Sequence, residues 1–87
     1  MYVVTVTYIW RGILEEIAVV IGQDKETASI EAEKVAMQWA AEKMDFTPEE
    51  MADCEDEILS GCFSSGYHDL IIHHPDTVIN LTNGEQK

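Results

Sequence analysis

The sequence is short of positive charge. Its 87 residues contain five Lys and Arg against seventeen Asp and Glu, which gives a formal net charge of −12 at pH 7. Proteins hold nucleic-acid phosphates and anionic lipid surfaces chiefly with Lys and Arg. We therefore expect neither direct nucleic-acid binding nor membrane binding. A basic protein surface is the natural partner of so acidic a chain.

Cysteine and long apolar runs are also scarce. Cys54 and Cys62 are the only cysteines, and the chain begins directly with a strand pattern where a signal peptide would otherwise stand. No apolar run approaches the roughly 20 residues that span a bilayer as a helix. The sequence therefore predicts a cytoplasmic protein with reduced thiols rather than a disulfide framework.

The motifs that hold metal ions are missing as well. No paired Cys or His motif of the zinc type is present, and His73 and His74 are neighbours in an expected strand, so their side chains would point to opposite faces. Carboxylates alternate at positions 53, 55 and 57 as in a calcium loop, but Ile58 stands where that loop requires glycine. We therefore expect no metal site and no cofactor.

The groups that could form a nucleophilic site are Cys54 or Cys62, or Ser64 and Ser65, together with His68. Their spacing matches no known catalytic arrangement. We expect no catalytic residue, and hence a protein that is not an enzyme. A bound metal or a reactive Cys62 would favour an enzyme instead.

Two strand patterns open the chain. Tyr2–Trp10 (YVVTVTYIW) and residues 13–21 are rich in β-branched and aromatic side chains, and Arg11 and Gly12 between them suit a two-residue turn. That turn pairs Trp10 with Ile13 and predicts one apolar face for the hairpin. The predicted core face comprises Tyr2, Val4, Val6, Trp10, Ile13, Ile17, Val19 and Ile21.

A long helix is expected next, with Asp24 as its N-cap. Its apolar stripe at helical spacing comprises Ala28, Ala32, Val35, Ala36, Trp39 and Ala40. A second line consists of Ile30, Met37, Ala41 and Met44. This second line indicates either burial against the following helix or a symmetry mate, or an exposed interaction strip.

Residues 45–57 (DFTPEEMADCEDE) contain seven carboxylates and no Lys or Arg. Thr47 and Glu50 have the spacing of a capping box, and Pro48 occupies the first helical position, so a helix is expected from Pro48 to about Ser60. Its inward side is expected to comprise Met51, Ala52, Cys54, Ile58 and Leu59. Its outward side, the candidate partner-binding surface, comprises Glu49, Glu50, Asp53, Asp56 and Glu57. Glu55 interrupts the inward side.

The remaining chain predicts a loop over residues 62–69 that could include a short edge strand, and then a hairpin of residues 70–73 and 78–81 around Pro75. The fold class is therefore α+β, with a four-stranded antiparallel sheet in the order strand, strand, helix, helix, strand, strand. The long helix packs on one face of the sheet. Residues 1–82 form a single domain, and residues 83–87 form a flexible C-terminal tail.

In layout and charge, the chain resembles small acidic phage-encoded inhibitors of bacterial defence, notably anti-CRISPR proteins and DNA mimics. The segments that carry the resemblance are YVVTVTYIW, ASIEAEKVAMQWAAEKM and TPEEMADCEDE. The resemblance implies a non-enzymatic inhibitor in the host bacterial cytoplasm. Such a protein would mimic nucleic acid and occupy the basic nucleic-acid-binding surface of a CRISPR effector or a similar complex.

A second hypothesis is a homodimeric structural or adaptor module. It would use either the edge of the first strand or the strip of Ile30, Met37 and Met44 as its interface. Its acidic surface would then serve solubility only.

Overall fold

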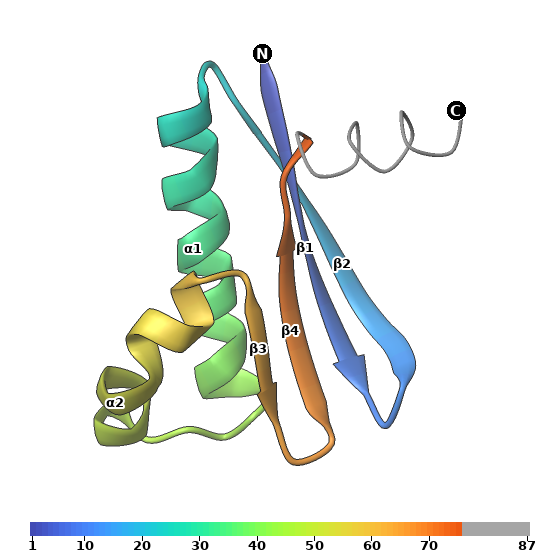
Figure 1. Cartoon of the computed structure of the whole chain (residues 1–87), viewed down its shortest axis with the longest axis vertical. Coiled ribbons are helices and arrows are strands. Elements are labelled where there is room, and N and C mark those ends of the chain that lie inside the picture. Colours follow the sequence, from blue (N-terminus) through green and yellow to red (C-terminus); the bar gives the residue numbers. More distant parts are fainter. Residues whose placement is uncertain (76–87) are drawn as a thin grey trace, which may run out of the picture.

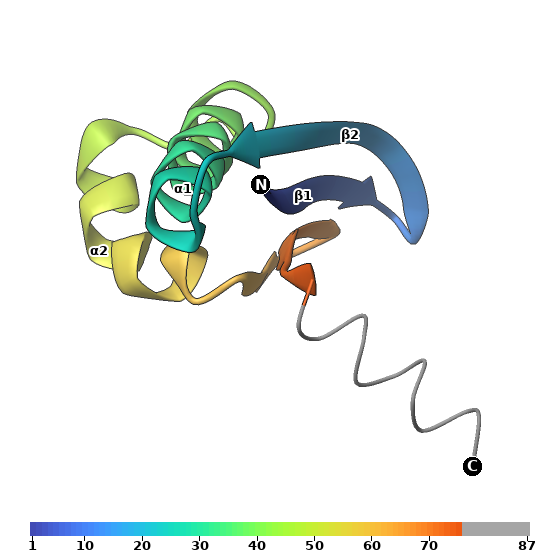
Figure 2. The same cartoon turned by 90° about the horizontal axis from the view of Figure 1, so that it is seen from above.

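The computed structural model describes residues 1–75, and the predicted strand at 78–81 and tail at 83–87 lie outside the described residues. The elements are β1 (Tyr2–Trp10), β2 (Ile13–Gly22), α1 (Lys25–Glu42), α2 (Pro48–Leu59), β3 (Cys62–Ser65) and β4 (His68–His73). The strands form one antiparallel sheet, and both helices lie on the same side of it (Figures 1 and 2). The α+β class and the predicted order of elements are confirmed.

The four strands lie in the order β2-β1-β4-β3, so β4 returns to pair with β1 and β3 forms an outer edge. The predicted edge strand within residues 62–69 therefore exists. The rest of that stretch is not a loop, because Gly66 takes a positive φ in a tight turn and β4 already begins at His68. Residues 70–73 are in a strand as predicted, and β3 is one of its partners.

The hairpin of β1 and β2 departs from the predicted register at one residue. Trp10 lies opposite Ile13, as predicted, but Tyr8 pairs with Glu16 rather than with Glu15. Glu15 is thus the extra residue of a β-bulge. Every pair beyond the bulge is shifted by one position relative to the prediction.

This shift corrects the predicted core face of β2. Because side chains alternate along a strand, a shift of one residue moves each of them to the other face. Ala18 and Val20 pack against the core, whereas Ile17, Val19 and Ile21 are exposed. Ile13 and Trp10, at the turn, are exposed too, so the prediction is right for Val4, Val6 and Tyr2 and wrong for the others.

The helix α1 begins and packs as expected. The carboxylate of Asp24 accepts a hydrogen bond from the backbone N–H of Thr27 at 2.8 Å. A Cβ atom on Gly22 would lie only 2.7 Å from the backbone nitrogen of Ala28, so glycine lets the chain turn closely from β2 into α1. The buried residues of α1 are Ala28, Ala32, Ala36, Trp39 and Ala40. Small alanines allow the helix to sit close to Val4, Val6 and Leu70 of the sheet.

The second apolar line of α1 is largely buried. Met44, just beyond the helix, is buried, and Met37 packs against the core, whereas Ile30 is exposed. The interaction strip of the dimer hypothesis is therefore mostly occupied by the chain's own packing. The edge of β1 is not free either, since β1 lies between β2 and β4. Neither described helix is long and apolar enough to cross a membrane.

Candidate protein interface on helix α2

The start of α2 is fixed by a capping box, as the sequence predicts. The backbone N–H of Glu50 donates to the hydroxyl of Thr47 at 3.2 Å, and the backbone N–H of Thr47 donates to the carboxylate of Glu50 at 2.9 Å. The Thr47 backbone N–H lowers the pKa of Glu50, because it stabilises the charged carboxylate. The helix then runs from Pro48 to Leu59.

The inward side of α2 is narrow. Ile58 is fully buried, and Met51, Cys54 and Leu59 are half-buried, but Ala52 is exposed, contrary to the prediction. This stripe faces α1 and β3, which are the neighbours of α2 in the structure. An edge-to-face contact of Phe46 with Phe63, at 5.9 Å between ring centroids, anchors the segment that leads into α2.

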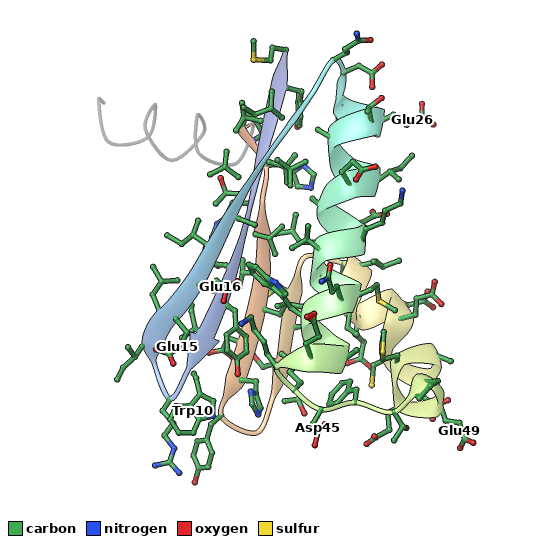
Figure 3. All side chains as sticks on the ribbon, turned by 180° about the vertical axis from the view of Figure 1, so that it is seen from behind. Trp10, Glu15, Glu16, Glu26, Asp45 and Glu49 are labelled. Atoms are coloured by element: carbon green, nitrogen blue, oxygen red, sulfur yellow. The ribbon has the colours of Figure 1, made fainter. Side chains whose placement is uncertain are left out.

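The outward side of α2 is exposed, as the sequence predicts. All five predicted residues are exposed: Glu49, Glu50, Asp53, Asp56 and Glu57. Glu55 is exposed as well, although a turn of about 100° per residue places it between the half-buried Met51 and Leu59 on the inward side. We call the five outward residues, Glu49, Glu50, Asp53, Asp56 and Glu57, the acidic face. In Figure 3, Glu49 points away from the body of the protein at the outer edge of α2.

The charge density of the acidic face is high. From Glu49 to Glu57 the helix axis rises by roughly 12 Å, and the Cβ atoms of residues three or four apart on a helix are about 5 to 6 Å from one another. B-form DNA has one phosphate about every 3.4 Å along each strand. The acidic face is therefore of the same order of charge density as a nucleic-acid strand.

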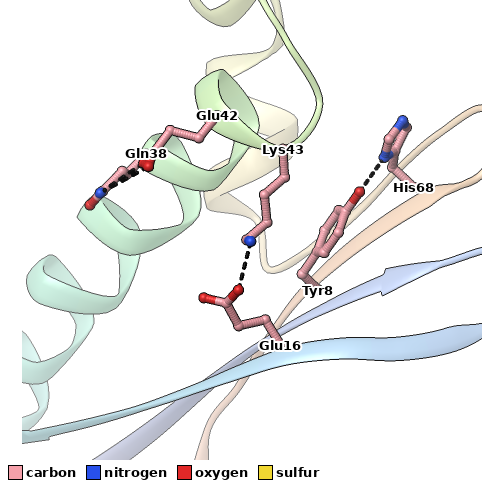
Figure 4. A network of polar contacts seen from close by, with 6 residues as sticks. All are labelled: Tyr8, Glu16, Gln38, Glu42, Lys43 and His68. Atoms are coloured by element: carbon pink, nitrogen blue, oxygen red, sulfur yellow. Dashed lines mark hydrogen bonds and ion pairs between the residues drawn. The ribbon is translucent and has the colours of Figure 1, made fainter.

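Three cations within residues 1–75, Lys34, Lys43 and Arg11, contact groups outside α2. Lys34 pairs with Glu31 at 3.2 Å on α1, and Lys43 pairs with Glu16 of β2 at 2.6 Å (Figure 4). The Glu16 carboxylate raises the pKa of Lys43 through this hydrogen bond. The sequence of α2 contains no Lys or Arg, so the acidic face has no cation of its own helix to neutralise it.

Arg11, at the tip of the hairpin, stacks on two aromatic rings. Its guanidinium lies 4.7 Å from the ring centroid of Trp10 and 4.8 Å from that of Tyr67. The backbone N–H of Arg11 also donates to the carbonyl of Tyr67 at 2.8 Å. These contacts join the β1–β2 turn to the β3–β4 turn, and they engage a third cation far from α2.

The histidines and cysteines do not converge on a common site. His68 contacts the hydroxyl of Tyr8 at 2.6 Å, and His73 contacts the hydroxyl of Thr7 at 3.0 Å on the opposite face of the sheet (Figure 4 shows the first contact). Cys54 and Cys62 are free thiols. Within residues 1–75, no group of three or more His, Cys, Asp or Glu side chains is arranged to hold a metal ion.

No protein-family model, curated protein or solved structure matches this chain. The function is therefore inferred from the chain's own residues and their geometry.

Proposed function

We propose that this protein is a non-enzymatic inhibitor that binds a basic nucleic-acid-binding surface through the acidic face of α2. One observation carries the proposal: six exposed carboxylates share one helix that contains no Lys or Arg. Repulsion between these groups works against the helix, because like charges three or four residues apart are mutually destabilising. A partner rich in Lys and Arg would relieve that repulsion on binding.

The arrangement suits rapid, charge-steered association. Complementary potentials raise association rates and disfavour partners of the wrong sign. The packing of Ile58, which is buried, and of Met51 and Cys54, which are half-buried, fixes the rotation of α2 about its own axis. The carboxylates are therefore held toward solvent before a partner arrives. Such preorganisation lowers the entropy lost on binding.

The resemblance in layout and charge to phage-encoded inhibitors suggests the class of target. We propose a nucleic-acid-binding protein of a bacterial defence complex, such as a CRISPR effector. The acidic face would occupy the channel that otherwise holds DNA or RNA phosphates. Inhibition would then be stoichiometric and competitive with nucleic acid.

A charge-reversal experiment tests this function. The variant with Asp53→Lys, Asp56→Lys and Glu57→Lys is expected to lose capture of basic nucleic-acid-binding proteins from a nuclease-treated bacterial lysate at low salt. For a captured protein, we expect Kd to rise at least about 100-fold, since three charge contacts become repulsive. Added duplex DNA is expected to compete with the unaltered protein.

The matched control reverses Glu15, Glu31 and Glu42, which are exposed carboxylates outside α2. It changes the net charge by the same amount and is expected to retain capture. Unchanged binding by the α2 variant would refute the proposal. Equal loss in both variants would show that a partner senses net charge and not the acidic face.

A further inference from the structure

The sheet has a second face that neither helix covers. We call it the open face. Side chains of directly paired residues share a face, and the pairs Val3↔Ile21, Thr5↔Val19 and Thr7↔Ile17 lie opposite the side on which α1 packs. β4 contributes Ile71 and His73 through its pairs with Thr7 and Thr5. Figure 2 shows α1 and α2 together on the other side of the sheet.

The open face exposes large aliphatic side chains. The exposed fractions are 53% for Ile17, 61% for Val19 and 62% for Ile21, and Val3 is 38% exposed. Residues that sequence patterning assigns to a core therefore stand in solvent in the single chain. Contiguous apolar patches of this kind usually mark an interface.

The open face is also nearly free of charge. Its three rows around Thr5, which include Val3, Thr7 and their paired neighbours on β2 and β4, contain no Asp, Glu, Lys or Arg. Asp69 of β4 lies on the open face beyond these rows, and its carboxylate accepts a hydrogen bond from the hydroxyl of Ser64 at 2.5 Å. In a chain of net charge −12, another copy of equal charge can approach these three rows without facing carboxylates.

We infer that the open face is the interface of a homodimer, in which two copies pack their sheets face to face about a two-fold axis. Such an interface is isologous, so the same patch must be self-complementary. Apolar Val and Ile rows meet this condition. A basic partner would find no charge complement here, and the acidic face of α2 lies on the helical side of the sheet, so each copy would leave it accessible.

The size of the open face suits a weak dimer. The strands β1 and β2 have nine and ten residues, whereas β3 has four and β4 has six. At about 3.3 Å per residue and about 4.8 Å between strands, the sheet covers roughly 450 Å² on each copy. The total of roughly 900 Å² is in the range of weak, concentration-dependent interfaces. Two sheets packed face to face at about 10 Å would interdigitate the exposed Ile and Val side chains.

Pairing of two copies through the edge of β2 is another dimer that the topology allows. Edge pairing would join the two sheets side by side. The side chains of Ile17, Val19 and Ile21 would then remain in water, on an apolar surface twice as large as that of one copy. Face-to-face packing removes them from water, and burial of apolar area is the main driving force for association. The face is therefore favoured over the edge.

Sedimentation of the full-length chain at several concentrations, in about 0.5 M NaCl to screen repulsion, tests this inference. The unaltered protein is expected to sediment as a dimer. Thr5→Lys on the central strand β1 and Val19→Lys on β2 are each expected to raise the dimer Kd at least about 100-fold, because each buries an unpaired charge. Circular dichroism checks that both variants remain folded. Ile30→Lys, at an exposed aliphatic residue on α1, is the matched control and should remain dimeric.

Three results would overturn the inference. The first is a monomer of the unaltered protein at all concentrations. The second is a dimer that Thr5→Lys leaves intact while Val19→Lys dissociates it, because that outcome assigns the contact to the β2 edge. The third is a dimer that Ile30→Lys disrupts equally. None of these outcomes bears on the acidic face, since its binding weakens with salt whereas apolar dimerisation does not.

Discussion

Asp24 controls where α1 begins and links that boundary to pH. Its carboxylate accepts the backbone N–H of Thr27, and this hydrogen bond lowers the pKa of Asp24 from its ordinary value of 3.8. The unfolded chain therefore binds more protons than the folded chain at pH values between the two pKa values. The contribution to stability is fully present above the unfolded pKa and is lost as pH falls through the folded pKa.

We expect Asp24→Asn to isolate this effect, because Asn caps a helix about as well as Asp but does not titrate. At about pH 7 the unaltered protein should be the more stable of the two, since a charged cap interacts favourably with the helix N-terminus. The difference should disappear as pH falls below the folded pKa of Asp24. Urea unfolding of both proteins across this pH range measures it. A difference that does not change with pH would contradict the assignment.

Glu50 combines two roles in one side chain. Its carboxylate closes the capping box with Thr47, and it is also exposed at the start of the acidic face. Substitution of Glu50 therefore cannot separate stability from binding. For this reason the reversal variant uses Asp53, Asp56 and Glu57, whose exposed side chains take no part in the capping box and can be changed without loss of a cap.

Negative charge at the C-terminal end of α2 lowers the stability of this helix. Acids in the first turn, Glu49 and Glu50, interact favourably with the helix dipole, but Asp56 and Glu57 lie near the C-terminus, where negative charge is unfavourable. The last turn of α2 contains no basic residue. The apolar stripe around Ile58 holds the element in place despite this arrangement.

We predict that Asp56→Lys with Glu57→Lys raises the free energy of unfolding by about 1 kcal/mol at low ionic strength, because both the dipole interaction and the repulsion improve. Glu49→Lys is the control at the other end of the same helix and should lower it. Thermal or urea unfolding at low salt and at about 1 M NaCl would show the effect and its screening. A loss of stability in the double variant would mean that these acids support the fold.

Across the whole molecule, repulsion among seventeen acids is only partly offset by five bases. At about 10 mM salt the Debye length is about 30 Å and spans a small domain, whereas at about 150 mM it is about 8 Å. Net charge of one sign destabilises the compact state through self-repulsion. Stability should therefore depend on ionic strength in the direction opposite to that of a protein held together by surface ion pairs.

We expect the melting temperature to rise when NaCl is increased from about 10 to 150 mM. The Glu15, Glu31 and Glu42 reversal variant should show a smaller rise. Each reversal changes the charge by two units, so three take the net charge from −12 to −6. Calorimetry at a fixed low protein concentration measures both proteins while limiting the contribution of dimerisation. A melting temperature that falls with salt would contradict the view that self-repulsion outweighs the attraction between surface ion pairs.

The sequence alone determined the features that depend on neighbours along the chain. The starts of α1 and α2 follow from the cap at Asp24 and the capping box at Thr47, whose hydrogen bonds span three residues, and the structure confirms them. The alanine stripe of α1 follows from helical periodicity. The α+β class follows from the order of these local patterns, since strand pairs joined by short turns are antiparallel.

Only the tertiary structure decided which side of several elements is inside. The bulge at Glu15 reversed the faces of β2, because a strand that is apolar on both sides carries no periodic signal to fix its register. Glu55 is exposed although helical periodicity places it between Met51 and Leu59 on the inward side, so periodicity alone did not show that its carboxylate stays in water. The pairing of β4 with β1 and β3 likewise depends on contacts distant in sequence. The open face exists for the same reason, because packing against α1 determines which of the two apolar sides of β2 is buried.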